Sequence, residues 1–348
     1  MVQSLFCRRN LLAGGIFLQI LATIIMNRLN FYSTAISAAF LILTQASFSQ
    51  LKWVKVNEQF GPLPAGIEVF ESRDSIDGKP NRCFYIMADL KDKNLQFTTQ
   101  VSTGKRLTPT QFFEQEDKPL AVVNGTFFSF QTNSNLNTVI RNGKLLAYNV
   151  PVVKNRNDSL YRYVTRSAIG ITKKRKADVA WLYTDTFSRY ALALQKAPLT
   201  HTGPLANPGM KEIKMALGNE HGAQKKWKMQ TAIGGGPALL HQGKINITNK
   251  EEIMFVNGES DQHPRTAMGY TNDGKLIILM VEGRNPGIAE GMTLKQEASI
   301  LQQLGCFEAL NLDGGGSSCL LLNGKETIKP SDKEGQRPVP GVFMIYSK

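Results

Sequence analysis

Asn311-Leu-Asp-Gly-Gly-Gly-Ser-Ser318 is a glycine-rich turn framed by two apolar runs, Phe307–Leu310 and Cys319–Leu322. This pattern predicts a strand, a sharp turn and a second strand. Three consecutive glycines cost chain entropy and pack little, so they are expected where backbone must approach something closely or expose its N–H groups. Asp313 stands at the mouth of the turn, and successive N–H groups in such a turn can form an anion-binding concavity. Glycines alone indicate a tight loop, but the acid and the two serines make a functional site an equally good interpretation.

Four other polar clusters stand at the ends of apolar runs. They are Ala121-Val-Val-Asn-Gly-Thr-Phe-Phe128, Ala232-Ile-Gly-Gly-Gly-Pro-Ala-Leu239, His263-Pro-Arg-Thr-Ala-Met-Gly269 and Val281-Glu-Gly-Arg284. The last two open and close one predicted hairpin, so Arg265 should lie near Glu282 and Arg284. Each residue alone has an ordinary explanation in a turn or a surface ion pair. Together they supply two arginines, two carboxylates, an amide and two glycine turns, and arginine suits bidentate recognition of phosphate.

The rest of the chain is typical of short strands joined by tight turns. Hairpin turns are expected at Asp77-Gly78, Asn142-Gly143, Asn272-Asp-Gly274 and Asn323-Gly324. Two helices are expected, one opening with a capping box at Thr108-Pro-Thr-Gln111 and a clearer one over Thr293–Gly305. The polar region 197–228 is interpreted as a surface excursion that would serve as a lid. We therefore predict one strand-rich α+β domain over residues 50–348, with a mixed or antiparallel sheet, several hairpins and few helices.

Residues 1–49 have a different composition. Two nearly uncharged runs, Leu11–Met26 and Phe31–Phe48, are separated by a short polar segment. Either both runs are membrane segments, or translation starts at Met26 and residues 1–49 are a leader. The first run is short for a complete membrane span, which favours the leader.

The leader interpretation has three regions in the required order. Asn27-Arg28 gives a basic start, Ala35–Leu43 gives an apolar centre, and Ser47-Phe48-Ser49 gives a small-x-small cleavage site. We therefore expect an exported protein that is periplasmic, secreted or at the cell surface. Membrane contact is expected only through an uncleaved leader.

Charge points to an acidic partner. The formal net charge is +13, and because the first 49 residues hold three arginines and no acid, residues 50–348 carry +10. This suits an acidic or phosphorylated partner. The most basic run, Lys173-Lys-Arg-Lys176, lies between two strand-like runs and is interpreted as a solvated hairpin tip. No aromatic interleaving or nucleic-acid motif accompanies it, so we expect no nucleic-acid partner.

The cysteines and histidines do not form a recognisable framework. Cys83, Cys306 and Cys319 would remain after processing, and this odd number argues against dense disulfides, although a Cys306–Cys319 bridge stays open. The histidines lack metal-ligand spacing, so we expect no metal, no cofactor and a surface or structural role for each. They are His201, His221, His241 and His263.

Taken together, the clusters resemble the phosphodiester glycosidase family. The matching pieces are Asn124-Gly-Thr-Phe-Phe128, Gly234-Gly-Gly-Pro237, Pro264-Arg-Thr-Ala-Met-Gly269, Val281-Glu-Gly-Arg284, Gly291-Met-Thr-Leu-Lys-Gln-Glu-Ala298 and Asn311-Leu-Asp-Gly-Gly-Gly-Ser-Ser318. They stand in the family's order, and the resemblance runs from about residue 80 to residue 348. The set is specific, whereas no single piece is. Two positions depart from the family pattern: Glu282 where Asp is frequent, and Cys319 where a small polar residue is expected.

The resemblance implies hydrolysis of a sugar-1-phosphodiester or phosphorylated glycan, releasing the sugar and leaving a phosphomonoester. It implies that Asp313 and Glu282 are the catalytic candidates. It also implies a substrate-binding set made of Asn124, Gly235, Gly236, Arg265, Thr266, Arg284, Gly314, Gly315, Gly316 and Ser317.

The chemistry of such a reaction differs from that of ordinary glycosidases. A phosphomonoester is a good leaving group, so charge stabilisation by arginines and N–H groups matters more than protonation. One carboxylate, Asp313 or Glu282, would activate water or stabilise an oxocarbenium-like centre, while retention or inversion stays open. Two alternatives remain. A phosphodiesterase would break P–O, although metal-cluster spacing is missing, and a non-catalytic glycan- or phosphate-binding module would not require Asp313.

Overall fold

The computed structural model describes residues 50–154, 159–199, 201–217, 225–255 and 258–348. The predicted leader over residues 1–49 and His221 lie outside these residues. The description below concerns the unit Gln50–Lys348.

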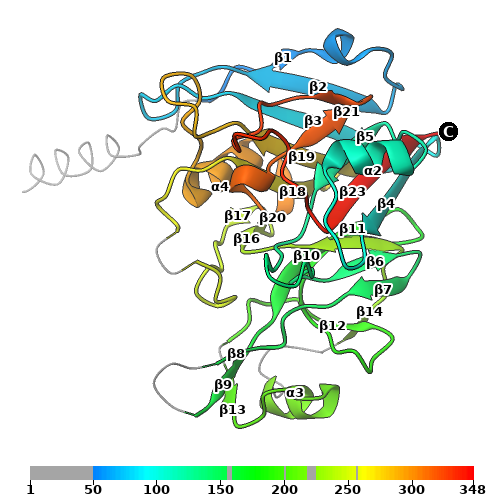
Figure 1. Cartoon of the computed structure of the whole chain (residues 1–348), viewed down its shortest axis with the longest axis vertical. Helices are drawn as coiled ribbons and strands as arrows, with labels where there is room; N and C mark the ends of the chain where they lie inside the picture. The colour runs from blue at the N-terminus through cyan, green and yellow to red at the C-terminus, as the bar shows by residue number, and fades with distance from the viewer. Residues whose placement is uncertain (1–49, 155–158, 200, 218–224, 256–257) are drawn as a thin grey trace, which may run out of the picture. The chain divides into compact units, whose positions relative to one another are not determined.

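Antiparallel strands dominate the described residues (Figure 1). The pairing between named strands is antiparallel throughout. The eight-stranded sheet has the order β1 (Val54–Lys55), β2 (Ile67–Ser72), β3 (Cys83–Asp89), β19 (Lys275–Val281), β18 (Arg265–Thr271), β20 (Cys306–Asn311), β16 (Ala238–His241) and β17 (Lys244–Ile245). The five-stranded sheet has the order β22 (Lys325–Glu326), β21 (Leu320–Leu322), β5 (Ala121–Asn124), β23 (Gly341–Ser347) and β4 (Leu95–Val101).

Two further sheets complete the strand content, and both lie in the lower half of Figure 1. The seven-stranded sheet has the order β14 (Lys225–Trp227), β12 (Ala191–Leu194), β11 (Ala177–Tyr183), β10 (Arg166–Ile171), β15 (Thr231–Gly234), β6 (Val139–Arg141) and β7 (Lys144–Ala147). The three-stranded sheet has the order β13 (His201–Gly203), β9 (Tyr161–Tyr163) and β8 (Val152–Lys154).

The described part of the chain contains three α-helices: α2 (Pro109–Gln115), α3 (Met210–Leu217) and α4 (Leu294–Gln303). Both predicted helices are confirmed, and each begins with a capping box, Thr108 with Gln111 in α2 and Thr293 with Gln296 in α4. Two 3-10 turns, η1 (Asn57–Phe60) and η2 (Gly315–Ser317), are also present. Among the described helices, none has the length and apolar character that a membrane span needs.

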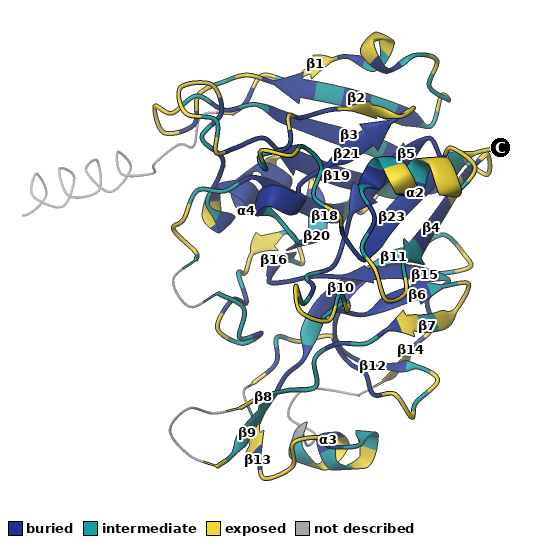
Figure 2. Cartoon of the chain, viewed as in Figure 1, coloured by how far each residue is buried: buried dark blue, intermediate teal, exposed yellow. Residues whose placement is uncertain are grey.

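The main core is shared by three sheets, because alternate side chains of each point into it. Val69 and Ile86 come from the eight-stranded sheet, Val123 from the five-stranded sheet, and Ile169 and Ile233 from the seven-stranded sheet. The opposite face of the eight-stranded sheet packs on α4, and the opposite face of the five-stranded sheet packs on α2. The strands that meet at this core are the dark blue, buried segments of Figure 2, whereas α2 turns exposed side chains to solvent.

The predicted hairpin turns are confirmed. Asp77-Gly78, Asn142-Gly143 and Asn323-Gly324 each place both residues at positive φ, the conformation that Asn-Gly and Asp-Gly favour. Lys173-Lys-Arg-Lys176 is the tip of the β10–β11 hairpin. Arg265 pairs directly with Val281, so the two ends of the β18–β19 hairpin meet as expected.

One prediction needs correction, and one open question is answered. Region 197–228 is not a plain excursion, because its described residues form β13, α3 and β14, and the buried Ile213 anchors α3. Its glycines, prolines and lysines concealed that one apolar contact. The Cys306–Cys319 bridge is absent: Cys83, Cys306 and Cys319 are all buried free thiols.

Candidate active site

The Asp313 turn lies where the chain leaves the eight-stranded sheet and enters the five-stranded sheet. β20 ends at Asn311, and β21 begins at Leu320. The Leu312 N–H donates to Thr266 O at 2.7 Å, and the Asp313 N–H donates to Gly125 O at 2.9 Å. Backbone from both sheets therefore fixes the position of the acid.

Asp313 carries a carboxyl group with an unusual environment. The side chain is half-buried, and burial raises the pKa of Asp313 to about 7. Three neighbours oppose that rise: the Ser317 hydroxyl, the charge of Arg337 and the Gly314 N–H. The Ser317 hydroxyl is itself buried and falls short of a well-formed hydrogen bond. A carboxyl group of this kind changes charge near neutral pH, as acid–base catalysts do.

Two guanidinium groups flank the three glycines. A Cβ added to Gly315 would lie 2.9 Å from Arg284 Nη2, and a Cβ added to Gly316 would lie 2.0 Å from Arg337 Nη2. The absence of a side chain at Gly315 and Gly316 therefore leaves the space that the ends of these arginine side chains occupy. Arg337 also forms a two-point ion pair with Asp332, at 2.7 and 2.8 Å.

Arg284 is exposed and holds a left-handed backbone conformation, with φ of 57°. Its Nη2 lies 3.5 Å from His263 Nδ1. Burial and the charges of Arg265 and Arg284 lower the pKa of His263, which keeps its ring neutral at pH 7. His263 thus lies at the rim of the cluster. Nothing in the sequence indicated this position, because the spacing of the histidines matched no metal site.

Asn124 and Thr266 form hydrogen bonds that fix the Asp313 turn. Both are buried. The Asn124 amide donates from Nδ2 to Asp313 O at 2.6 Å, and its Oδ1 accepts from the Thr266 hydroxyl at 2.9 Å and from the Cys319 N–H at 3.1 Å. Because these bonds occupy the Asn124 amide, the side chain holds Asp313 in position.

Arg265 is buried beside α4, with only 4% of its surface exposed. Its Nε donates to Met292 O and its Nη2 donates to Asp261 O, each at 2.8 Å. Glu297 lies close enough to interact with its charge, is fully buried, and has no hydrogen-bond partner on either carboxylate oxygen. Burial raises the pKa of Glu297 to about 8. The sequence did not lead us to predict that Arg265 and Glu297 lie close together in the interior. The position of Glu297 on the apolar face of α4, three residues after Leu294, could have indicated it.

Glu282 is 2% exposed, and its carboxylate is already bound by the protein. Oε2 accepts from Arg82 Nη1 at 3.4 Å and from the Lys329 N–H at 3.2 Å, while Oε1 accepts from Asn285 Nδ2 at 3.1 Å. These bonds tie three chain segments together at the end of β19. Glu282 therefore has less capacity to act on a ligand than Asp313 has.

The other glycine triplet, Gly234–Gly236, is bonded to the backbone of neighbouring segments. The Gly235 N–H donates to Ser167 O at 3.0 Å, and the Gly236 N–H donates to Asn311 O at 2.7 Å. Both residues are buried. Their N–H groups are not available to an anion, so we do not carry Gly235 and Gly236 into the proposed site.

The structure thus brings together part of the predicted set and adds to it. Asp313, Ser317, Arg284 and the glycines 314–316 form one cluster, joined by His263, Asp332 and Arg337. Arg337 was not predicted as a site residue, because it lies in the polar loop between Pro330 and Pro340, away from the glycine-rich motifs. Of the other predicted residues, Asn124 and Thr266 support the Asp313 turn from buried positions. Arg265 and Glu282 are also buried, but they bond to other parts of the chain.

Comparison with known proteins supports the family resemblance. Residues 182–346, just under half of the chain, match the phosphodiester glycosidase family. The chain is 40% identical over 112 residues to mouse N-acetylglucosamine-1-phosphodiester alpha-N-acetylglucosaminidase, covering 29% of this chain and 21% of the mouse protein. It is also 41% identical over 85 residues to the prophage-derived protein YomE of Bacillus subtilis, covering 24% of this chain and 13% of that one. The chain therefore spans only 21% of the length of the mouse protein and 13% of the length of YomE.

Solved structures share the fold. The zebrafish N-acetylglucosamine-1-phosphodiester alpha-N-acetylglucosaminidase catalytic domain, auto-inhibited by its pro-peptide, superposes with a TM-score of 0.55 at 21% identity, covering 86% of this chain and 89% of that one. A Burkholderia pseudomallei protein described as exported gives 0.55 at 17% identity, covering 79% and 75%. At these identities the likeness establishes the fold alone, and the roles of this chain's residues rest on its own geometry.

Proposed function

We propose that this chain is a hydrolase that cleaves the glycosidic C–O bond of a sugar-1-phosphodiester, releasing free sugar and leaving a phosphomonoester. The match of residues 182–346 to the phosphodiester glycosidase family supports the substrate class. One observation on the chain itself carries the proposal: Asp313 lies at a glycine turn flanked by the guanidinium groups of Arg284 and Arg337.

In this proposal the phosphate lies against the glycine turn. Arg284 is exposed and offers most of its donors to a ligand. Arg337 donates to Asp332 from Nε and from Nη2, and its other guanidinium N–H groups remain for a phosphate oxygen. Because Gly315 and Gly316 have no side chains, the guanidinium groups of Arg284 and Arg337 lie against the turn, where one phosphate would meet both.

Asp313 is the carboxylate that we assign to the chemistry. Glu282 is nearly inaccessible and bound by three donors, whereas Asp313 is only half-buried and lies in the cluster. In its ionised form Asp313 would activate water or stabilise the oxocarbenium-like centre. The phosphomonoester leaves without needing a strong acid, because the two arginines stabilise its developing charge.

Asn124 and Arg265 are positioning residues in this proposal. The Asn124 amide holds Asp313 O, so we assign it to fixing the acid instead of binding the substrate. Arg265 holds Met292 O and Asp261 O, and so fixes the segment that carries His263 and Pro264. Gly315 in turn donates its N–H to Pro264 O at 2.8 Å.

We further propose that residues 50–348 act as one α+β domain of an exported protein. The order of basic, apolar and small-residue regions from Met26 to Ser49 supports export. A structural relative that is described as exported supports it as well. N-terminal sequencing of secreted or periplasmic material would test it, and a mature N-terminus before residue 30 would contradict it.

The reaction is tested by hydrolysing a panel of sugar-1-phosphate methyl diesters in oxygen-18 water. The proposal predicts turnover with the label in the released sugar, because the C–O bond breaks. Label in the phosphate would instead assign a phosphodiesterase that breaks P–O. Absence of turnover with retained binding would assign a non-catalytic binding module.

A further inference from the structure

A second site lies on the outer face of the seven-stranded sheet, away from the Asp313 cluster. A groove of about 560 Å³ opens there, with a floor that includes Ile140, Ala191, Trp227 and Met229. The β10–β11 hairpin tip and the loop before β12 form its rim. We call this feature the basic groove. None of its lining residues belongs to the Asp313 cluster.

The lining of the basic groove carries charge of one sign. Five of its residues are cationic and none is acidic: Lys173, Lys174, Lys176, Arg189 and Lys228. The nearby acid Asp178 is already engaged, accepting from the Trp227 indole at 2.6 Å and from Gln195 Nε2 at 3.1 Å. A concave surface lined by one sign of charge concentrates oppositely charged ligands.

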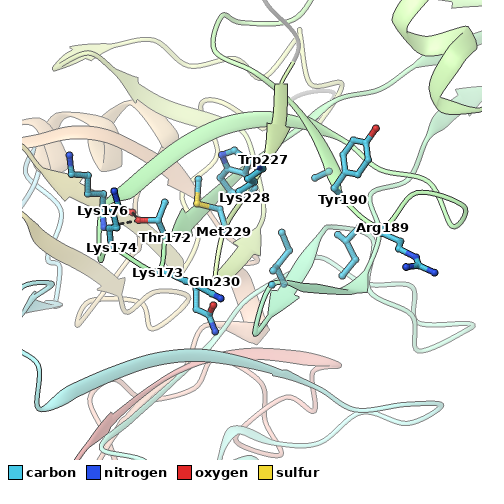
Figure 3. A pocket seen from close by; sticks show the side chains of 14 residues that line it. Thr172, Lys173, Lys174, Lys176, Arg189, Tyr190, Trp227, Lys228, Met229 and Gln230 are labelled. Carbon is cyan, nitrogen blue, oxygen red and sulfur yellow. Dashed lines mark hydrogen bonds between the residues drawn. The ribbon is translucent and has the colours of Figure 1, made fainter.

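The floor is a built apolar surface. A Cβ added to Gly170 would lie 2.5 Å from Met229 Cγ and 2.7 Å from the Trp227 ring, so glycine in β10 lets both side chains lie flat across the sheet. The hydrogen bond to Asp178 fixes the indole. Figure 3 shows the hairpin lysines at one end of the groove, Arg189 and Tyr190 at the other, and Trp227 and Met229 between them.

We infer that the basic groove binds a phosphodiester-linked polymer, with phosphates at the cationic ends and the carbon skeleton of a repeat on the apolar floor. Lysine binds phosphate as a point charge, and apolar C–H surface gains by leaving water at such a floor. The inference rests on the proposed function for the identity of the ligand: the polymer would be a chain of phosphates and polyol units that carries the sugar-1-phosphodiester. The groove would then hold units of the substrate remote from the bond that breaks.

Other polyanions fit this groove less well. Single-stranded nucleic acid needs open aromatic faces for base stacking, but Trp227 is 6% exposed and the Lys226 ammonium lies 4.4 Å from the centre of the Tyr190 ring. An anionic membrane surface needs protruding apolar side chains, but Ile140, Trp227 and Met229 are all buried in the floor. A thin, alternating chain of phosphates and polyol units reaches both the rim and the floor.

Binding of synthetic poly(glycerol phosphate) to the purified protein tests this inference. The variant Lys174→Glu/Lys228→Glu should bind about tenfold more weakly, since two rim charges are reversed. The matched control Lys244→Glu/Lys295→Glu makes the same change of net charge at two exposed lysines on β17 and α4, and it should bind as the parent does. Equal weakening by both variants, or by neither, would overturn the inference. So would equal or tighter parent binding to single-stranded DNA or anionic vesicles.

A kinetic comparison separates this inference from the proposed function. The groove variant should raise KM for a poly(glycerol phosphate) bearing sugar-1-phosphodiesters and leave kcat/KM for a methyl diester unchanged. Unchanged KM for the polymer would contradict the groove while the proposed function stands. Absence of turnover of every diester would contradict the proposed function, and the binding experiment would still decide the groove.

Discussion

The chain contains two triple-glycine turns, and the protein uses them differently. Gly234–Gly236 leads from the seven-stranded to the eight-stranded sheet, and Gly314–Gly316 leads from the eight-stranded to the five-stranded sheet. In the first turn all three N–H groups donate to backbone carbonyls, at 2.7 to 3.0 Å. In the second, a half-buried acid precedes the glycines and two guanidinium groups lie against them.

This difference shows that a glycine triplet marks a place where other atoms come close to the backbone. The surrounding residues decide whether those atoms belong to another strand or to charged side chains. Around Gly235 the close neighbours are the backbone oxygen of Asn311 and the side chain of Leu312. Around Gly315 and Gly316 they are the charged ends of Arg284, Arg337 and Asp332. The first turn packs two sheets together, and the second presents charge at a surface. Their flanking residues, Ile233 before one and Asp313 before the other, carry that distinction in the sequence.

The sharpest contrast comes from adding one methyl group to each turn. Gly235→Ala should lower the free energy of unfolding by about 3 kcal/mol, because its Cβ would lie 2.5 Å from Asn311 O, which is backbone and cannot move freely. Gly316→Ala should fold normally but lose activity at least about tenfold, because its Cβ displaces the flexible ends of Arg337 and Asp332. Denaturant unfolding and kcat/KM for both variants measure this. Equal stability losses would break the comparison.

The two arginines of one hairpin give a second contrast. Arg284→Lys should lower kcat/KM about 100-fold without changing the melting temperature, because an exposed, phosphate-binding fork is lost. Arg265→Lys should chiefly lower stability, by about 2 kcal/mol, because its buried guanidinium serves two carbonyls. Full kcat/KM in Arg284→Lys would remove that residue from the phosphate site.

The smallest expected effect is a displaced pH profile. If ionised Asp313 is the active form, kcat/KM should rise with pH and level off above an inflection near 7. The Arg337 charge lowers the pKa of Asp313, so Arg337→Gln should move that inflection upward. Rates measured from pH 5 to pH 9 on both proteins test this, with a flat profile or a downward displacement as the contrary result.

The sequence was sufficient where local chemistry decides the structure. Asn-Gly and Asp-Gly turns need positive φ, so Asn142-Gly143 and Asn323-Gly324 were predictable as hairpin tips. Thr108 and Thr293 were predictable as helix starts because their caps form locally. The family's motifs then placed Asp313 and Arg284 in one site.

The sequence was insufficient where the answer depends on which elements pack together. Arg265 and Thr266 are adjacent, yet alternate along β18, so one lies beside α4 and the other beside Asn124. Arg337 reaches Gly316 through a loop whose path no local pattern sets. Gly235 and Gly314 look alike in the sequence, because each belongs to a run of three glycines. The partners of their N–H groups in the structure distinguish them.

The Asp313→Asn variant tests the central claim most directly, because it removes the charge and keeps the size of the side chain. Turnover of a sugar-1-phosphodiester, substrate affinity and melting temperature should be measured together. Because burial raises the folded-state pKa of Asp313 to about 7, its contribution to stability is present at low pH and lost as pH rises through 7. The variant should therefore be at least as stable as the parent, most visibly above pH 7, and should bind substrate, while turnover falls about 100-fold or more. Normal turnover by the folded variant would contradict the account, as would a loss of activity that merely follows a loss of stability.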